Sequence, residues 1–571
     1  MKLDIKFKSG LCSQYGQDCS NEYNFLVNFR EAIKGVSAYE QYRNSGGTLS
    51  ESEFNNSLLN VNQIEDKVDK ENGKGLSSND FTDEDKAEVD KVINKVDKVA
   101  GKGLSTNDFT DADKAEVDKV DGKFDKASIL QTTGDRTDAV MSQDASTREL
   151  NAIKEIIYDN TNWYWYGFEY DKTVTAPEVT RIGNLDLHKS LPIQNTMKGC
   201  LLNDDGTVNK YLDENDWSNE TLDGSQGQVM VEIPRYYFKC EEDGDIVRMK
   251  FSTYDIPDYV EVKKQYVGAY EATVQRSASK LCSVQNTTPD YRGGANQSDW
   301  DTLAKSVLGK PATSISRINY KNYARNRGNG SKWNGYLYSA HLSLYHLFIL
   351  EYGTRNSQAA YTAELTVDGY KQGGLGNGVT DVIGTNWSEF NGYNPFIPCG
   401  HTNILGNGTG EVEYTQLNDA EEVLWSTMVN RYRGVELPFG HIFKWADGIN
   451  IDRTETDSKA YIARNPEDFS DTGVDGYEYV GLESRDVGYV KNILAGKYGD
   501  VMPSEVGGGS TTNFCDYHYT SESAGLRGVR FGGFAINGSS AGFACSSSAL
   551  SPALASAHFG SRLCFLDINN N

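Results

Sequence analysis

The sequence predicts a multidomain chain in which a segmented α-helical coiled-coil stalk carries a C-terminal part of mixed α+β structure. The segment 73–92 recurs almost verbatim at 101–120, and valines spaced three and four residues apart follow the predicted helix starts. The composition then shifts from Lys and Glu to aromatic residues, Gly, Asn and Ser. The length of 571 residues exceeds one ordinary domain. We therefore expect an N-terminal segment, a stalk, a β-rich intermediate domain and a C-terminal head, at 1–60, 61–160, 161–300 and 301–571.

The overall charge and the N-terminal segment narrow the classes of partner. The formal net charge is −25, which argues against nucleic acid, because phosphate binding depends on clustered Lys and Arg. No apolar stretch reaches the roughly 18–20 residues that a membrane span needs, so no membrane insertion is expected. Residues 2–8 alternate charged and apolar side chains, unlike a secretory signal. If the protein works outside a cell, a route other than ordinary secretion takes it there.

The two repeat copies predict helix starts. In each copy a threonine stands three residues before an aspartate, at Thr82 and Asp85 and again at Thr110 and Asp113. This spacing is typical of a capping box, in which a hydroxyl and a carboxylate satisfy the free amides of the first helical turn. A helix is therefore expected to begin near each threonine.

Apolar residues behind these caps predict self-association. They lie at Val89, Val92, Val96 and Val99 after the first cap and at Val117, Val120 and Phe124 after the second. This is the a/d spacing of a coiled coil, and each seam is too short to be stable as a lone helix in water. The spacing does not decide between dimer and trimer. A solvated, partly disordered charged linker remains the alternative.

The globular part begins near Thr161, where aromatic residues become dense. Two apolar segments, 229–240 and 246–251, flank Asp243-Gly244, which predicts a β-hairpin because its turn needs positive φ. Helices are expected at 318–325 and at 339–352. Short strands in Gly/Asn-rich loops are expected for the rest.

No catalytic, cofactor or metal site is predicted. The nine cysteines have no metal-site spacing and are interpreted as small buried residues, with one or two disulfides left open. The seven histidines are isolated, and His341 and His346 are five apart, off the spacing of two ligands on one helical face. Nucleophile-elbow, P-loop and zinc-protease motifs are absent from the sequence. A pair of glycosidase carboxylates stays open, because its members can come from any part of a sequence.

Several segments of the sequence resemble segments of viral proteins. Segments 101–110, 130–134 and 139–143 resemble segments of phage tail fibres. From about residue 160 to 571 the chain is similar to a family of phage and prophage tail proteins of gut anaerobes, with matching segments at 181–188, 227–234, 268–274, 351–358 and 432–445. The resemblance implies a homotrimeric tail fibre that is made in the host cytoplasm and becomes part of the virion. Residues 1–60 would then join the tail or baseplate.

The C-terminal end also resembles an enzyme fold. Gly440–Trp445, Arg530–Phe534 and Gly560–Leu563 are similar to segments of the C-type lectin fold in its formylglycine-generating-enzyme variant. His441 and Lys444 replace an Asn and a Glu of that family, and Cys545 and Cys564 do not reproduce its close cysteine pair. The resemblance therefore implies a C-type-lectin-like head that binds rather than catalyses. His441 is expected to pack or hydrogen-bond beside Trp445.

The run between Gly532 and Phe565 resembles the variable regions of retroelement-diversified proteins, in which exposed loop positions change between copies. Its aromatic, small and amide residues are typical of adaptable binding loops. The candidate receptor-binding residues are Phe534, Ile536, Asn537, Ser539, Ser546, Ser547, Ser548, Leu550, Pro552, Leu554, His558 and Phe559. About half of the phenylalanines here could equally belong to the core.

These observations predict a receptor-binding protein without enzymatic activity. Its ligand would be a protein or a glycan on the host surface. A tail-associated glycan depolymerase and a structural baseplate component remain as alternatives.

Overall fold

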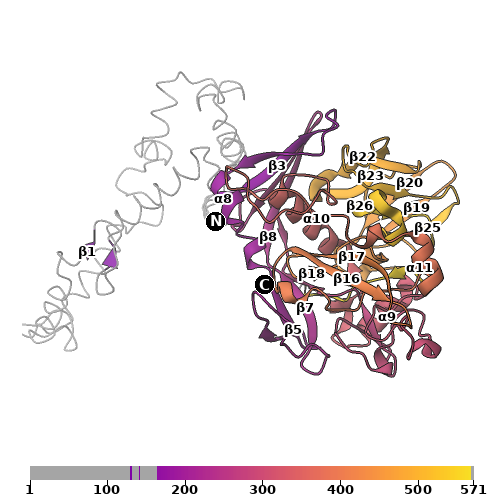
Figure 1. Ribbon diagram of the computed structural model, residues 1–571. Coiled ribbons are helices and arrows are strands. Elements are labelled where there is room, and N and C mark those ends of the chain that lie inside the picture. Colours follow the sequence, from indigo (N-terminus) through magenta and orange to yellow (C-terminus); the bar gives the residue numbers. More distant parts are fainter. Residues whose placement is uncertain (1–128, 131–139, 142–163, 568–571) are drawn as a thin grey trace, which may run out of the picture. The chain divides into compact units, whose positions relative to one another are not determined.

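The computed structural model describes residues 129–130, 140–141 and 164–567 (Figure 1). The chain divides into two units, 1–161 and 162–571. In the first unit the described residues form two short strands, β1 (Ile129–Leu130) and β2 (Val140–Met141), which pair in parallel.

The predicted fold class is wrong. A coiled-coil stalk was expected at 61–160, but the residues described in that range form this strand pair, and the rest of the range lies outside the described residues. A mixed α+β, lectin-like head was expected after it, but the structure is mainly β-sheet with a nearly closed, barrel-like sheet. The reason is that many short segments pair with partners far away in sequence, which local patterns do not reveal.

The first sheet of the second unit contains the predicted hairpin. Its strand order is β10-β8-β9-β3-β4. The strands are β3 (Tyr166–Asp171), β4 (Thr180–Gly183), β8 (Tyr236–Asp243), β9 (Ile246–Ser252) and β10 (Val260–Val262). β8 and β9 pair in register from Asp243–Ile246 outward, and Gly244 has φ +62° in the turn, so the hairpin prediction is confirmed. The apolar segment before it is split at Pro234, which has no N–H to donate to a ladder.

The second sheet joins distant parts of the chain. Its strand order is β14-β28-β11-β7-β5-β6. The strands are β5 (Lys198–Leu202), β6 (Val208–Tyr211), β7 (Gln228–Ile233), β11 (Gln265–Gly268), β14 (Trp333–Asn334) and β28 (Cys564–Leu566). β28 is antiparallel to both β11 and β14, so residues on either side of residue 300 share this sheet.

The third sheet, of ten strands, nearly closes on itself. The main path runs β21-β20-β19-β25-β26-β24-β22-β23, and β15 and β27 pair with β19. The strands are β15 (Tyr336–Leu337), β19 (Phe443–Arg453), β20 (Ser458–Ile462), β21 (Glu478–Leu482), β22 (Gly488–Ala495), β23 (Asp500–Val506), β24 (Tyr517–Tyr519), β25 (Gly525–Gly532), β26 (Gly542–Ser547) and β27 (Phe559–Gly560). The Ser484 N–H donates to the Pro503 carbonyl at 2.8 Å and so links the two ends of the path.

Two smaller strand groups and the helices complete the described structure. β16 (Gly410–Leu417), β17 (Val423–Tyr432) and β18 (Val435–Glu436) form one sheet, and β12 (Thr273–Gln275) and β13 (Lys280–Cys282) form a hairpin. The α-helices are α8 (Leu185–Ser190), α9 (Arg317–Arg325), α10 (Tyr338–Tyr352) and α11 (Gly384–Asn391). The 3₁₀ turns are η4 (Gln194–Thr196), η5 (Pro289–Tyr291), η6 (Ser298–Trp300), η7 (Gly330–Lys332), η8 (Gly378–Asp381), η9 (Asn403–Leu405), η10 (Pro466–Asp468), η11 (Gly496–Tyr498) and η12 (Ala535–Ser540).

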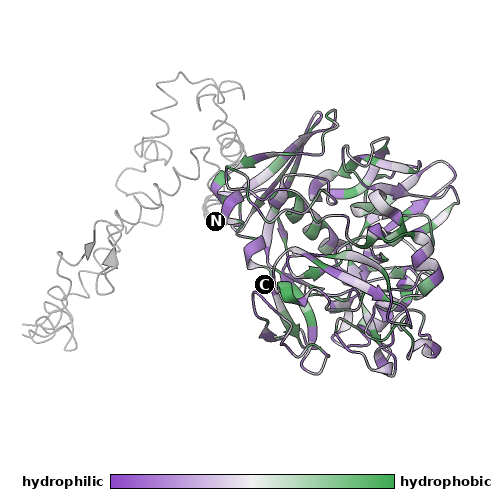
Figure 2. Ribbon diagram, viewed as in Figure 1, coloured by the Kyte–Doolittle hydropathy of each residue, from purple (hydrophilic) through white to green (hydrophobic). Residues whose placement is uncertain are grey.

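α10 forms the centre of the core. Every residue of this helix except Ser339 is buried, and the helix contacts β3, β11, β19 and β26. Figure 2 shows apolar residues concentrated on it and on the strands around it. A helix that is apolar on all sides is stable only when it is surrounded, so the sheets enclose it. The predicted helices at 318–325 and 339–352 are both confirmed, by α9 and α10. Among the described residues, no helix is long and apolar enough to cross a membrane.

The cysteines lead to a first testable prediction. Seven described cysteines are free, and all of them except Cys240 are buried. We expect at least seven thiols to react with a thiol reagent after denaturation without reductant, and few in the native protein. The thermal midpoint should be the same with and without reductant. Fewer than seven thiols would contradict the structure.

Candidate binding surface

Two groups of three aromatic side chains lie in the second unit, and the buried Phe443 ring contacts one member of each, Phe534 at 5.4 Å and Tyr519 at 6.3 Å. We call Tyr393, His558, Phe534, Tyr519, Tyr517 and Tyr489 the aromatic row. They come from the ends of α11 and η12, from β24 and β22, and from the loop 551–558. α11, β22, β25 and β26 appear together on the right of the unit in Figure 1.

Contacts between neighbouring rings join one half of the row. The rings of Phe534 and His558 are stacked, with centroids 4.3 Å apart, and Tyr393 meets His558 edge-on at 6.4 Å. Phe534 also packs against Trp387 and Phe443 underneath. Because Trp387 and Phe443 hold the Phe534 ring from the core side, the Phe534–His558 stack is fixed in position.

Tyrosines form the other half of the row. The rings of Tyr489 and Tyr517 are 5.0 Å apart, and those of Tyr517 and Tyr519 are 4.8 Å apart. The Asn537 amide donates to the Tyr519 hydroxyl at 2.8 Å, and the Tyr489 hydroxyl lies 3.3 Å from the Ser539 hydroxyl. Amide and hydroxyl groups therefore border the rings and are positioned by them.

Three large apolar side chains stand out from this surface. Tyr393 is 38% exposed, Ile536 is 44% exposed and Leu554 is 46% exposed. A Cβ added to Gly384 would lie 3.0 Å from the Ile536 side chain, so Ile536 sits against the start of α11. These three side chains are exposed apolar groups of this surface.

The structure distributes the predicted receptor-binding residues between surface and core. Ile536, Ser539 and Leu554 are exposed, and Phe534, Asn537, Leu550 and His558 are half-buried. Ser546, Ser547, Ser548, Pro552 and Phe559 are buried. The buried serines belong to β26 or directly follow it, between β24 and β25, and Ser546 and Ser547 contact His518 and Arg530. Their side chains therefore do not face solvent.

His558 presents a neutral ring in the row. Burial, with a smaller effect of Arg530, lowers the pKa of His558 to about 4. Its Nδ1 lies 3.1 Å from the Ser556 hydroxyl. The Arg530 guanidinium itself lies over the Phe559 ring, 3.9 Å from the centroid. At neutral pH the Phe534–His558 stack is thus uncharged and not cationic.

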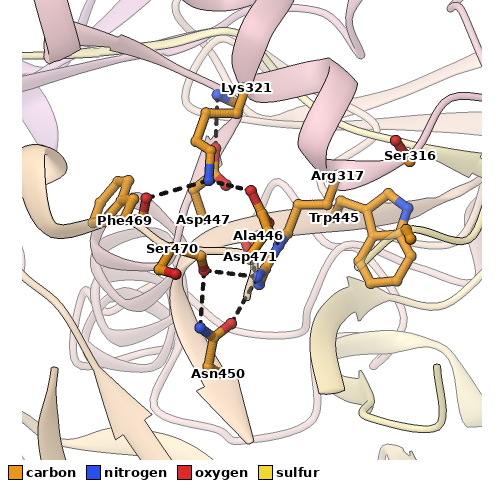
Figure 3. Close-up of polar contacts among 12 residues, drawn as sticks. Ser316, Arg317, Lys321, Trp445, Ala446, Asp447, Asn450, Phe469, Ser470 and Asp471 are labelled. Atoms are coloured by element: carbon orange, nitrogen blue, oxygen red, sulfur yellow. Dashed lines mark hydrogen bonds and ion pairs between the residues drawn. The ribbon is translucent and has the colours of Figure 1, made fainter. Parts of the chain in front are cut away.

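A buried ion network supports the loop 551–558. The backbone N–H of Arg317 donates to the Pro552 carbonyl at 3.1 Å. Its guanidinium donates to Asp471 at 2.7 Å and to Asn450 at 2.7 Å, and Lys321 also pairs with Asp471 (Figure 3). Burial opposes ionisation of Asp471, but the two cations outweigh it and lower its pKa. The network fixes α9 to β19 and to the loop 469–473, and α9 in turn holds the start of the loop 551–558.

A second buried cluster contains His441, which sequence reasoning placed beside Trp445. Its Nδ1 instead lies 2.6 Å from the Glu271 carboxylate, and its Nε2 accepts the Phe396 N–H at 3.2 Å. The other Glu271 oxygen lies 2.9 Å from Lys444 Nζ. Burial alone would raise the pKa of Glu271, but Lys444 and His441 outweigh it and lower the pKa to about 2. Sequence reasoning missed Glu271 because 170 residues separate it from His441.

Among the described residues, no group of three or more His, Cys, Asp or Glu side chains is arranged to hold a metal ion. Neither a protein-family model nor a curated protein sequence matches this chain.

Proposed function

We propose that this protein is a phage tail-fibre, receptor-binding protein that attaches the virion to a host cell through the aromatic row and the exposed residues beside it. The observation that supports this most is the combination of exposed Tyr393, Ile536 and Leu554 with the amide and hydroxyl groups of Asn537 and Ser539. Rigid rings supply contact area at low entropic cost, and short polar side chains adapt their hydrogen bonds to the ligand.

The other parts of this proposal depend on the sequence resemblance. They are a homotrimer, attachment of residues 1–60 to the tail or baseplate, and assembly into the virion after synthesis in the host cytoplasm. Three weak sites on one fibre would gain avidity without new contacts. Diversification of the C-terminal run would act on its exposed positions, such as Ile536, Ser539 and Leu554, because the buried serines are packed in β26.

Binding of the full chain to cells of gut anaerobes tests the proposal. The test variant carries Tyr393→Ala and Ile536→Ser, and the control carries Tyr254→Ala and Val174→Ser in the β9–β10 and β3–β4 connections. The four side chains are all well exposed, at 38%, 44%, 58% and 49% respectively. We expect saturable binding to some strains, weakened at least about tenfold in the test variant, since interface anchors each contribute more than about 1 kcal/mol.

The control should bind within about twofold of the unchanged protein, because surface substitutions outside an interface have small effects. Equal binding by test and control variants would contradict the proposed surface. Incubation with capsule from the same strains separates a binder from a depolymerase. Intact polymer is expected, and released oligosaccharides would show enzymatic activity instead.

A further inference from the structure

A polar pocket of about 270 Å³ lies among β7, the β12–β13 hairpin and the segment after α9. It is separate from the aromatic row and shares no residue with it. The lining residues are Asn203, Asp204, Gly224, Gly227, Gln228, Gln275, Lys280, Cys282, Tyr291 and Arg327. Such a volume is at the small end for ligand pockets and suits one small molecule or one sugar ring.

The protein holds the charged wall of this pocket in place. The Trp333 indole N–H donates to the Asp204 carbonyl at 2.8 Å, and the Asn329 amide donates to the Asp205 carbonyl at 2.9 Å. The Arg327 guanidinium pairs with the Asp204 carboxylate and donates to the Leu281 carbonyl at 3.0 Å. A wall fixed in this way loses little entropy when a ligand binds.

Hydrogen-bond donors are in excess in the pocket. Gln228 is only 3% exposed, and its Oε1 accepts the Ser283 N–H at 2.9 Å. Its amide nitrogen has no hydrogen bond to any described residue, nor has the hydroxyl of Tyr291. Lys280 uses one of its three N–H groups for Asp204, at 3.3 Å. These groups point to a ligand that is rich in acceptors.

The charged residues of the lining also favour a ligand that is rich in hydrogen-bond acceptors. The charged lining residues are two cations, Lys280 and Arg327, and one carboxylate, that of Asp204, while the carboxylates of Asp223 and Asp290 act on Tyr291 from outside the lining. An ammonium group and a guanidinium group both favour a carboxylate ligand, through charge-assisted hydrogen bonds. Asn203, Asp204 and Gln275 can accept hydrogen bonds from hydroxyl groups on the rest of such a ligand.

We propose that this pocket binds a small acidic sugar, with the sugar carboxylate against Lys280 and the Gln228 amide and the ring hydroxyls against Asn203, Asp204 and Tyr291. The ligand is either a free uronate or the acidic end of a glycan chain. This site goes beyond the proposed attachment function, because it uses other residues and does not require a host cell.

Calorimetric titration of the full chain tests this site. Sodium glucuronate, glucose and sodium acetate are the probes, together with a tetrasaccharide that ends in glucuronate. We expect glucuronate to bind at least about tenfold more tightly than glucose or acetate. Glucose lacks the carboxylate, and acetate lacks the ring hydroxyl groups. Binding of glucuronate but not the tetrasaccharide assigns the site to free sugars, and binding of both assigns it to glycan ends.

Substitutions in the pocket test whether the sugar binds there. Lys280→Gln should weaken glucuronate binding about tenfold, and Lys280→Arg should restore most of it because the positive charge returns. Lys491→Gln is the matched control, since Lys491 is an exposed lysine paired with Glu505 at 2.7 Å, and it should change nothing. Equal affinities for glucose and glucuronate, no glucuronate binding at millimolar concentrations, or an unchanged affinity in folded Lys280→Gln would each overturn the proposal.

Discussion

Replacing Glu271 with glutamine is expected to lower the free energy of unfolding by about 3–5 kcal/mol at pH 7. Glu271 is the carboxylate that faces both Lys444 and His441, and all three side chains are buried. Without it, the Lys444 ammonium is buried without its counter-charge, or it loses its proton. Deprotonation costs about 1.36 kcal/mol per pH unit, or about 5 kcal/mol between pH 7 and the usual lysine pKa of about 10.4. This cost is the upper limit of the loss in the free energy of unfolding.

The pH dependence of this loss gives a sharper test. Burial lowers the pKa of Lys444 to about 8 even with Glu271 present. In the variant the folded state holds Lys444 neutral, while the unfolded state keeps it protonated up to about pH 10.4. The unfolded state therefore binds more protons, and the stability of the variant rises with pH in this range. Above pH 8 the unchanged protein also loses the Lys444 proton. The difference in the free energy of unfolding between the variant and the unchanged protein should therefore be smaller at pH 9 than at pH 7.

Denaturant unfolding at both pH values measures this effect. Glu505→Gln is the matched control, because Glu505 forms an exposed pair with Lys491, and it should change stability by less than about 1 kcal/mol. The double variant Glu271→Gln with Lys444→Met should be more stable than the single one, because it removes the buried charge that the single variant leaves. A single variant as stable as the control would contradict the buried pair.

Replacing Asp471 with asparagine is expected to lower the free energy of unfolding by about 3 kcal/mol. Asp471 is the shared partner of Arg317 and Lys321, whose side chains are almost completely buried. Asp447 remains in the cluster, but burial raises the pKa of its carboxyl, so it replaces the lost charge only in part. The variant should also loosen the loop 551–558, since Arg317 holds that loop through the Pro552 carbonyl.

Thermal unfolding and amide hydrogen exchange measure the two consequences separately. Asp457→Asn is the matched control, because Asp457 forms an exposed pair with Lys459 at 3.7 Å. The control should leave stability within about 0.5 kcal/mol. An Asp471→Asn variant with unchanged stability would show that the network in Figure 3 contributes nothing to the fold.

Sequence reasoning succeeded where the structural signal is local. The hairpin around Gly244 follows from a turn residue between two alternating segments, and α10 from a long apolar run that ends at Gly353, whose φ is +73°. Each signal depends on neighbours within a few residues, so a short window of sequence contains it. The split at Pro234 could have been read from the same kind of signal.

The fold class was wrong because it depends on pairing between distant residues. β28 pairs with β11 and β14, and the residue pairs involved are hundreds of positions apart in the chain. The run of small residues from Ser546 to Ser548 was interpreted as an exposed loop, but pairing with β24 and β25 places it in the interior. Short Ser and Ala side chains suit a crowded strand and a surface loop equally well, so their types alone do not separate the two.

By itself, the sequence determined the composition, the repeat, the helices α9 and α10, the β8–β9 hairpin and the C-terminal region that carries the candidate surface. Only the tertiary structure decided that the second unit is mainly β-sheet, that Tyr393 and Tyr489 join Phe534 and His558 in one row, and that Glu271 meets His441. The physical reason is that contacts between distant segments are set by how whole sheets bury their apolar faces, and no short stretch of sequence contains that information.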